Sequence, residues 1–254
     1  MKPPAIATFR FYEELNDFLP KEKRKRQFEY CLKLNQTVKD AIEAIGVPHT
    51  EVDLIIINGE SAGFAYHPQH ADFISVYPVF ESFNIKSVVK LRPKPLRVTK
   101  FVLDVHLGKL CKYLRMLGFD TFYHNHLEDS EIIKISITQK RIILTRDIGI
   151  LKNGKVTHGY WLRSQNPREQ IQEVIKRFDL LKDIKPFNRC TVCNGLVRNV
   201  DKEKVTDLLE PGTKKYYHQF FQCESCLKIY WEGSHYEKMN TFIEDVVAAK
   251  KPQE

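Results

Sequence analysis

The sequence predicts a mixed α/β chain with a small α+β unit, then a parallel-sheet α/β unit, then a short cysteine-bearing region. Three observations support this prediction. Apolar runs alternate with polar residues around one helix before residue 80, strands alternate with helices over residues 101–151, and two C-x2-C pairs follow residue 187. At 254 residues the chain is long enough for about two domains with buried cores.

Basic residues outnumber acidic ones. Lys plus Arg number 40 and Asp plus Glu number 32, which gives a net charge of +8 and a pI near 9.0. This balance suits a polyanionic partner, although it also occurs in proteins that are merely soluble. The first 18 residues have no apolar core of signal-peptide length, and no stretch approaches the roughly 20 apolar residues of a membrane span. The sequence therefore predicts a cytoplasmic protein with no membrane partner.

Residues 5–80 are predicted to form the α+β unit. The runs IATFRFY and FEYCLKL alternate like the strands of a hairpin. Thr37 and Asp40 have the spacing of a capping box for a helix that Gly46 ends. The runs VDLIII and FISVYPVF follow, with an Asn-Gly turn after the first. Two strands, a helix and further strands make a β-grasp.

The run VDLIIING followed by DFISVYPVF resembles the ubiquitin-like sulfur carriers, which act through a C-terminal Gly-Gly. Here the chain continues through Glu81 with no diglycine, so sulfur transfer or protein conjugation is not expected. We expect residues 1–82 to be a ubiquitin-like domain that docks a protein partner. The alternative is a module that only stabilises its neighbour.

Residues 83–98 are predicted to be a basic linker. Prolines 93 and 95 stiffen it. Such a strip could follow a phosphate backbone by counterion release, or it could be a solvated, self-repelling connector. Residues 86–100, which span most of this linker and the first two positions after it, contain no acid and six cations: Lys86, Lys90, Arg92, Lys94, Arg97 and Lys100.

Two apolar runs within residues 101–151 each lead to an aspartate. The run FVLD ends at Asp104, and the run RIILTRD ends at Asp147. In a parallel sheet with right-handed connections, ligands bind beyond the carboxyl ends of the strands, so the two carboxylates would share one edge. The two carboxylates would repel each other unless a cation or a shared proton lay between them. A hard divalent metal ion with oxygen ligands is the cation most often found in such a place.

Asp129, before the helix SEIIKISITQK, is the third acidic candidate. It could be an N-cap or a third carboxylate of the metal site, and Glu128 and Glu131 compete for the second role. Asp147, directly after Arg146, could likewise be only a turn residue. Three acids at the exits of successive βα units nevertheless indicate a metal site.

Three cations are candidates for holding phosphate groups. Lys109 lies in the first turn of the helix after Asp104, Arg115 lies on the basic face of the same helix, and Arg146 adjoins an acid. That basic face could also be only a solvated surface. Further on, Asn166 stands where a fourth acid would be sought, but its pairing with Pro167 and a glutamate explains it as a helix cap.

The two C-x2-C pairs are the most specific pattern in the chain. Cys190 and Cys193 form one pair, Cys223 and Cys226 the other, and 29 residues separate them. Four thiolates in two such pairs suit a closed, structural zinc site. Disulfides are not expected in a cytoplasmic chain, and neither pair opens a helix after a strand as a redox motif does. Nearby aromatic side chains could pack over the zinc loops or stack on nucleobases: Tyr230, Trp231, His235 and Tyr236.

Several motifs in one order resemble the Mut-7-C RNase domain family, a PIN-like nuclease fold that carries a zinc ribbon. These motifs are FVLDVHLGKLCKYLRMLGFDT, the TRD turn, PFNRCTVCNGL and YWEGSHY, and the resemblance covers about residues 96–245. The preceding β-grasp looks like the ubiquitin-like domain often fused to this family. The resemblance implies a nuclease domain at 99–184 and a zinc ribbon with a C-terminal helix at 185–245.

The resemblance also implies a metal-dependent ribonuclease, with Asp104, Asp129 and Asp147 at the positions of the family's acidic set. Many PIN enzymes carry a fourth acid, and Asn166 leaves that ligand unassigned. The expected reaction is hydrolysis of RNA phosphodiester bonds with one or two Mg²⁺ or Mn²⁺ ions. The expected substrate is a single-stranded or structured RNA such as tRNA or rRNA.

Two alternatives remain at this point. In the first, the chain is a non-catalytic RNA- or ribosome-binding adaptor, in which the basic linker and the zinc ribbon bind and the acids only cap helices. In the second, the chain is a nuclease that acts on DNA.

Overall fold

The computed structural model describes residues 4–78 and 99–248, and the structural statements below concern those residues. The chain divides into two compact units, one made of residues 1–97 and 133–161 and the other of residues 98–132 and 162–254. The predicted linker at 83–98 lies outside the described residues.

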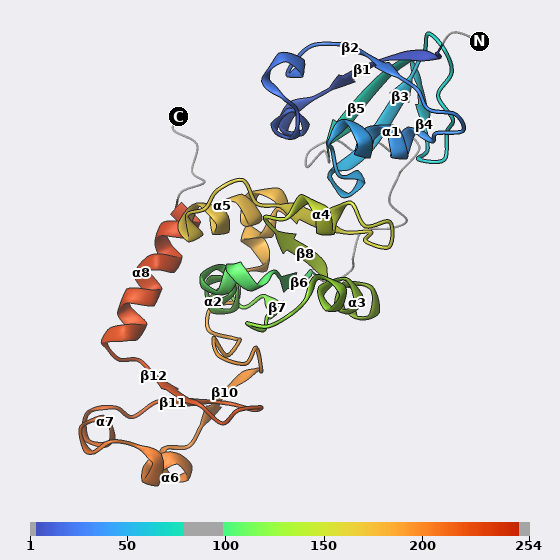
Figure 1. The fold of residues 1–254 in the computed structure, drawn as a ribbon. Helices are drawn as coiled ribbons and strands as arrows, with labels where there is room; N and C mark the ends of the chain where they lie inside the picture. Colours follow the sequence, from blue (N-terminus) through green and yellow to red (C-terminus); the bar gives the residue numbers. More distant parts are fainter. Residues whose placement is uncertain (1–3, 79–98, 249–254) are drawn as a thin grey trace. The chain divides into compact units, whose positions relative to one another are not determined.

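The first unit begins with a five-stranded sheet in the order β2-β1-β5-β3-β4 (Figure 1). β1 pairs with β2 in antiparallel fashion and with β5 in parallel, and α1 lies between β2 and β3 along the chain. This arrangement confirms the predicted β-grasp. Its elements are β1 (Ile6–Phe11), η1 (Glu13–Phe18), η2 (Lys21–Lys23), β2 (Phe28–Cys31), α1 (Val38–Ile45), η3 (His49–Glu51), β3 (Val52–Ile57), β4 (Glu60–Ala62) and β5 (Phe73–Pro78).

Local sequence signals account for the β-grasp elements. Thr37 and Asp40 form the expected capping box, and Gly46 ends α1 with φ of 131°. Asn58 and Gly59 both have positive φ, as a tight hairpin turn between β3 and β4 requires. The apolar faces of the sheet and of α1 meet in a core whose largest fully buried side chains are Phe9, Phe11, Leu15, Leu19, Ile42, Ile55 and Ile74.

Residues 133–161 complete the first unit with a strand, a short helix and a parallel strand. The elements are β8 (Ile142–Thr145), α4 (Ile148–Leu151) and β9 (Gly159–Trp161), and Ile143 pairs with Gly159 in the parallel register. All four residues of β8 are buried, as a parallel strand covered on both faces should be. The strand predicted over residues 156–162 is shorter than expected.

The second unit contains another βαβ segment, in which β6 and β7 pair in parallel with Phe101 opposite Thr121. Leu110, Leu114 and Leu117 of the connecting helix region are fully buried, as the apolar stripe predicts. The elements are β6 (Lys100–Leu103), η4 (Val105–Leu107), α2 (Gly108–Met116), β7 (Asp120–Phe122), α3 (Asp129–Gln139, which continues into the first unit), α5 (Pro167–Arg177) and η5 (Leu180–Asp183).

The cysteine-bearing region folds as a three-stranded antiparallel sheet in the order β10-β11-β12, followed by the long helix α8 (Figure 1). The parallel strand pairs, the β-grasp and this region confirm the predicted fold class. The elements are β10 (Val197–Val200), α6 (Lys202–Val205), η6 (Thr206–Leu208), α7 (Pro211–Tyr216), β11 (Phe220–Cys223), β12 (Ile229–Trp231) and α8 (Ser234–Ala248). Among the described residues, no helix is both long enough and apolar enough to span a bilayer.

Gly118, which follows α2, packs closely against the backbone of Lys185, just before the cysteine-bearing region. Its φ is +93°, and a Cβ atom there would overlap the Lys185 carbonyl. That close approach is held by hydrogen bonds from Lys185 N to the Leu117 carbonyl, 2.9 Å, and from Phe187 N to the Met116 carbonyl, 2.9 Å. Only glycine satisfies both the backbone conformation and the space.

We therefore expect Gly118→Ala to lower the free energy of unfolding by roughly 2–4 kcal/mol, measured by chemical denaturation. Gly212→Ala is the matched control, because Gly212 has nothing within 4 Å of a built Cβ. Its effect should stay within about 0.5 kcal/mol. Equal stability of the two variants would contradict the packing described for Gly118.

Candidate functional site

The four cysteines of the two C-x2-C pairs lie together. Their sulfur atoms are all within 4.8 Å of one another, and none of the six cysteines is in a disulfide. Cys190 and Cys226 sulfurs are 3.6 Å apart, and those of Cys193 and Cys223 are 3.4 Å apart. A tetrahedral zinc ion with Zn–S bonds of about 2.3 Å needs sulfurs roughly 3.8 Å apart. The cluster therefore fits a closed, four-sulfur zinc site.

Backbone N–H groups point at these sulfurs. Gly195 N lies 3.4 Å from the Cys193 sulfur, and Ser225 N lies 3.4 Å from the Cys223 sulfur. The Tyr230 hydroxyl lies 3.0 Å from the Cys190 sulfur. Burial alone would raise the pKa of the Cys190 thiol, but the Tyr230 hydroxyl and backbone N–H groups outweigh it and lower the pKa to about 6. At Cys190 these donors favour the thiolate that a metal binds, whereas burial raises the pKa of the Cys193 thiol to about 12 and also raises the pKa of Cys226.

The first cysteine turn is attached to α2 and β7 by Arg115. Its Nε donates to the Thr121 carbonyl at 3.0 Å, and its Nη1 donates to the Val192 carbonyl at 2.8 Å and the Thr191 carbonyl at 3.3 Å. Arg115 is only 5% exposed. One guanidinium thus joins a helix, a strand and the loop that carries Cys190 and its pair partner.

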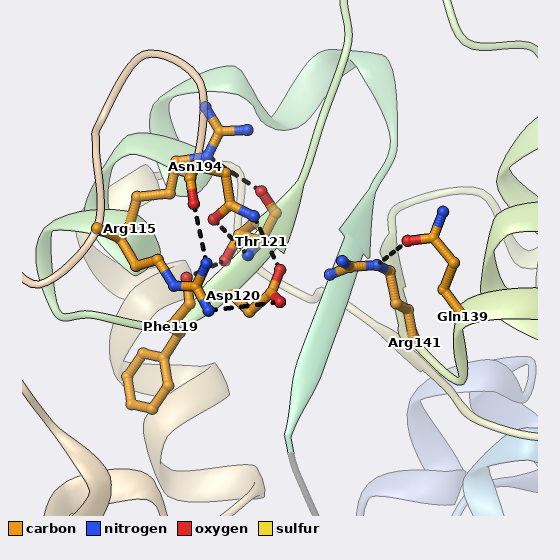
Figure 2. A network of polar contacts seen from close by, with 8 residues as sticks. Arg115, Phe119, Asp120, Thr121, Gln139, Arg141 and Asn194 are labelled. Atoms are coloured by element: carbon orange, nitrogen blue, oxygen red, sulfur yellow. Dashed lines mark hydrogen bonds and ion pairs between the residues drawn. The ribbon is translucent and has the colours of Figure 1, made fainter. Parts of the chain in front are cut away.

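Asn194 makes the second attachment between this turn and β7 (Figure 2). Its side-chain oxygen accepts from Thr121 N at 2.9 Å, and its Nδ2 donates to the Asp120 carboxylate at 2.8 Å. Arg189 adds an ion pair of 3.5 Å to Asp120 and donates to the Asn194 carbonyl at 3.0 Å. Asn194 therefore offers β7 the backbone hydrogen bond that a neighbouring strand would otherwise supply.

The expectation that Arg115 holds phosphate is wrong. Helical periodicity placed it on the polar face of α2, but the cysteine turn covers that part of the face, and the guanidinium is used by backbone carbonyls. The sequence signal for the attachment was the Cys-Asn-Gly run at 193–195, because Asn tolerates the positive φ of 70° that Asn194 adopts.

Asp104 lies directly after β6, at the carboxyl end of that strand, and is 8% exposed. It occupies the N-cap position of η4, but its side chain makes no capping hydrogen bond. The Tyr123 hydroxyl, just beyond β7, donates to the Val105 carbonyl at 2.7 Å. Burial first, and then the nearby Cys111 and Asp104, raise the pKa of Tyr123. The segments that leave β6 and β7 thus meet next to the Asp104 carboxylate.

Asp129 belongs to the same unit and lies on the segment that leaves β7. It is exposed and is the first residue of α3, so the N-cap interpretation is wrong by one position. Glu131, a competitor for the third metal carboxylate, acts at the helix start, where its carboxylate accepts from Glu128 N at 3.0 Å. His124 and His126, whose ring centroids are 5.9 Å apart with the rings tilted by 60°, lie between β7 and Asp129 along the chain.

Asp147 belongs to the first unit and follows the carboxyl end of β8. It is exposed and is the N-cap of α4, where its side chain accepts from Gly149 N at 2.6 Å. Its own N–H donates to the Thr145 hydroxyl at 2.8 Å. The turn interpretation is therefore correct for one carboxylate oxygen. A carboxylate has two oxygens and about four lone-pair sites, so capping does not prevent metal binding.

The β-grasp contacts the strand that follows Asp147. The Glu51 carboxylate, fully buried in η3, accepts from Trp161 N in β9 at 2.7 Å. The Trp161 indole in turn donates to the Arg146 carbonyl at 3.1 Å. His49 Nε2 lies 2.8 Å from the Val156 carbonyl, and the rings of Phe18 and Trp161 are 4.9 Å apart. Through Trp161, Glu51 of η3 is therefore linked by two successive hydrogen bonds to Arg146, the residue that precedes Asp147.

The remaining candidate residues lie at the start of α2, directly before Asp147 and at the start of α5. Lys109 is exposed in the first turn of α2, and Arg146 is half-buried directly before Asp147. Asn166 caps α5, as expected, by accepting from Arg168 N at 2.9 Å. The prediction that Glu169 completes the capping box with Asn166 is wrong, because the Glu169 carboxylate accepts from the Ser164 hydroxyl instead.

Comparisons with known proteins divide the chain in the same order. The family model for the Mut7-C RNAse domain matches residues 99–243, and the model for the Mut7-C ubiquitin domain matches residues 4–84. No curated protein matches. Among solved structures, small archaeal modifier protein 1 of H. volcanii matches 29% of this chain and 97% of its own, with 17% identity and a TM-score of 0.24.

Removing one sulfur ligand should release the metal and unfold the region around it, because structural zinc contributes folding free energy. We expect Cys223→Ser to reduce bound zinc from about one atom per chain to well below one, measured by elemental analysis, and to lower the unfolding temperature. Cys31→Ser, at an exposed cysteine of β2, is the matched control and should leave both unchanged. Full zinc content in Cys223→Ser would contradict the assignment.

Lysine cannot reproduce the fork with which Arg115 joins its carbonyls. We expect Arg115→Lys to lower the free energy of unfolding by roughly 2–4 kcal/mol, since buried carbonyls lose their donors. Arg198→Lys makes the same change at an exposed arginine and should cost less than about 0.5 kcal/mol. Loss of RNA affinity in Arg115→Lys at unchanged stability would restore the phosphate-binding role.

Proposed function

Because this chain belongs to the Mut7-C RNAse domain family, we propose that it is a metal-dependent ribonuclease that hydrolyses RNA phosphodiester bonds. The family model covers more than half of the chain. The supporting observation is that Asp104, Asp129 and Asp147 each follow the carboxyl end of a parallel strand inside the matched region. In α/β folds, ligands bind at that end of the strands.

The donor set fits Mg²⁺ or Mn²⁺, because both prefer oxygen ligands and three carboxylates offer them. We propose Asp104, Asp129 and Asp147 as the residues that hold the metal. Such an ion lowers the pKa of bound water and neutralises charge that develops on the phosphate. No protein nucleophile is required for this reaction class.

The chain's own residues would position the substrate and the acids. Lys109, exposed at the start of α2, and Arg146, adjacent to Asp147, are the proposed phosphate contacts. The hydrogen bond from Trp161 to the Arg146 carbonyl fixes the backbone at that point, and the Thr145 hydroxyl fixes the N–H of Asp147. Asp104 directly follows the buried strand β6 and is itself 8% exposed, so its backbone is anchored by that strand.

The ubiquitin-like domain is proposed to have two roles. Through Glu51 and His49 it supports β9 and the segment before it, which is the role of a module that stabilises its neighbour. Its remaining surface is proposed to dock a protein partner. We propose domain limits of 1–82, 83–98, 99–184 and 185–245, with zinc as a structural ion in the last.

The Asp147→Asn substitution tests the proposed ribonuclease. Asparagine can still cap α4, so the fold should be kept, while one metal ligand loses its charge. We expect cleavage of labelled RNA to fall by about 10²-fold or more, with RNA binding unchanged or tighter. Asp207→Asn, at an exposed acid of the zinc ribbon, is the control and should cleave normally.

The same assay separates the alternatives. Dependence of cleavage on added Mg²⁺ or Mn²⁺ is expected at constant zinc content. Salt-sensitive RNA binding without products in any metal would identify an adaptor instead, and products from a DNA strand alone would identify a deoxyribonuclease. Unchanged cleavage by Asp147→Asn would remove Asp147 from the site.

A further inference from the structure

The zinc ribbon contains a pocket of about 360 Å³ that the zinc site does not use. Its volume falls within the range of about 300–1,000 Å³ typical of small-ligand sites. The pocket lies between the start of the ribbon, the sheet β10-β11-β12 and the first turns of α8, all within the second unit.

One wall of the pocket is a row of side chains across the sheet. Asn199 of β10 is opposite Phe221 of β11, and Phe221 is opposite Tyr230 of β12. Directly opposed residues in neighbouring strands point to the same face, so these three side chains stand together. The Tyr230 hydroxyl is fixed by the Cys190 sulfur at 3.0 Å, which holds its ring in place.

Phe187 and Tyr236 form another part of the lining, with ring centroids 4.7 Å apart and an interplanar angle of 35°. These four rings are half-buried, and a fifth aromatic residue of the lining, Trp231, is exposed. Aliphatic side chains are few in the lining, where Val197 and Met239 are the main ones. A pocket for a leucine or isoleucine of a protein partner would be lined mainly by aliphatic groups, whereas flat aromatic rings suit a flat aromatic ligand.

The polar groups of the lining are also suited to such a ligand. Asn188 and Asn199 both line the pocket, and within the described part of the chain neither side-chain amide forms a hydrogen bond. A carboxamide can donate and accept at once, which matches the mixed donor and acceptor edge of a nucleobase.

The lining itself carries one basic residue, Arg189, and one acidic residue, Glu232, and the small excess of basic residues lies in the segments around them. The segments that form the pocket, 185–199 and 221–239, contain five basic and three acidic residues. Lys228 lies 5.7 Å from the Tyr230 ring centre, next to the aromatic row. The basic residues are Lys185, Arg189, Arg198, Lys228 and Lys238, and the acidic ones are Glu224, Glu232 and Glu237.

We propose that this pocket binds one unpaired nucleobase of the RNA strand, stacked on Phe221, Tyr230 and Tyr236 with its edge on Asn188 and Asn199. The proposal rests on the proposed function for its ligand class. It assigns the zinc ribbon a substrate-binding role in addition to its structural one, and it predicts that the protein prefers single-stranded over fully paired RNA at this point of contact.

The experiment measures affinity by fluorescence anisotropy of a labelled, short single-stranded RNA, in the zinc-loaded full chain carrying Asp147→Asn, with gel electrophoresis to verify that the RNA stays intact. Tyr236→Ala and Phe221→Leu should each weaken binding about 5- to 100-fold, since one stacked base carries that much affinity. Tyr216→Ala is the matched control, because Tyr216 is a 70% exposed aromatic residue of the same ribbon outside the pocket. Its affinity should be unchanged.

A change in the ligand tests the pocket without relying on a folded variant. RNA of the same length with abasic positions should bind the unaltered pocket more weakly, and Tyr236→Ala should show no further loss with it. Equal affinity for abasic and intact RNA would overturn the proposal, as would unchanged RNA affinity in Tyr236→Ala with full zinc content. If the wild-type chain fails to cleave RNA but Tyr236→Ala and abasic RNA weaken binding as expected, the nuclease proposal fails and the base pocket stands.

Discussion

The hydrogen bonds that join the first cysteine turn to β7 are the constraint on which the second unit depends. Arg115 and Asn194 together satisfy the Thr121 carbonyl and N–H from outside the strand pair, so β7 has partners beyond β6. β7 is only three residues long, and such a strand gains little from its own ladder. The first cysteine turn therefore covers the edge of β7. Because β7 leads directly to Tyr123 and on to Asp129, the turn also fixes where that segment begins.

This constraint gives the ribbon a structural connection to the proposed site. A zinc ion on the four sulfurs would hold the cysteine turn, the turn is bonded to β7, and the segment leaving β7 contacts the backbone beside Asp104 through Tyr123. A ribbon that was only an appended binding module would not need a buried arginine to attach it. In the first unit, Glu51 and Trp161 make a comparable connection from the β-grasp to the backbone before Asp147.

Much of the fold followed from local sequence signals. The capping box of α1, the Asn-Gly turn after β3 and the cysteine spacing each depend on residues close in sequence, and the structure confirms all three. Arg115 was misassigned because its carbonyl partners include Thr191 and Val192, 76 and 77 residues away. Helical periodicity separates an apolar face from a polar one, but it does not show which part of the polar face another segment covers.

The hydrogen bond between Glu51 and Trp161 could not be predicted from local sequence patterns either, since 110 residues separate the two. A fully buried carboxylate in a short 3-10 helix becomes understandable only when its acceptor role is seen. The Asn188 and Asn199 amides were missed for another reason, because isolated asparagines in a loop and a strand carry no pattern.

The contact between Glu51 and Trp161 also bears on how the matched regions would behave if separated. A fragment that began at residue 99 would contain every proposed metal ligand and the whole ribbon, yet the Trp161 amide would lose its carboxylate acceptor and the ring would lose Phe18. Such a fragment would expose an aromatic side chain and leave the Trp161 N–H without its protein acceptor, beside the segment bearing Asp147. Inactivity of that isolated fragment would then reflect the loss of a neighbouring domain rather than the absence of the proposed metal ligands.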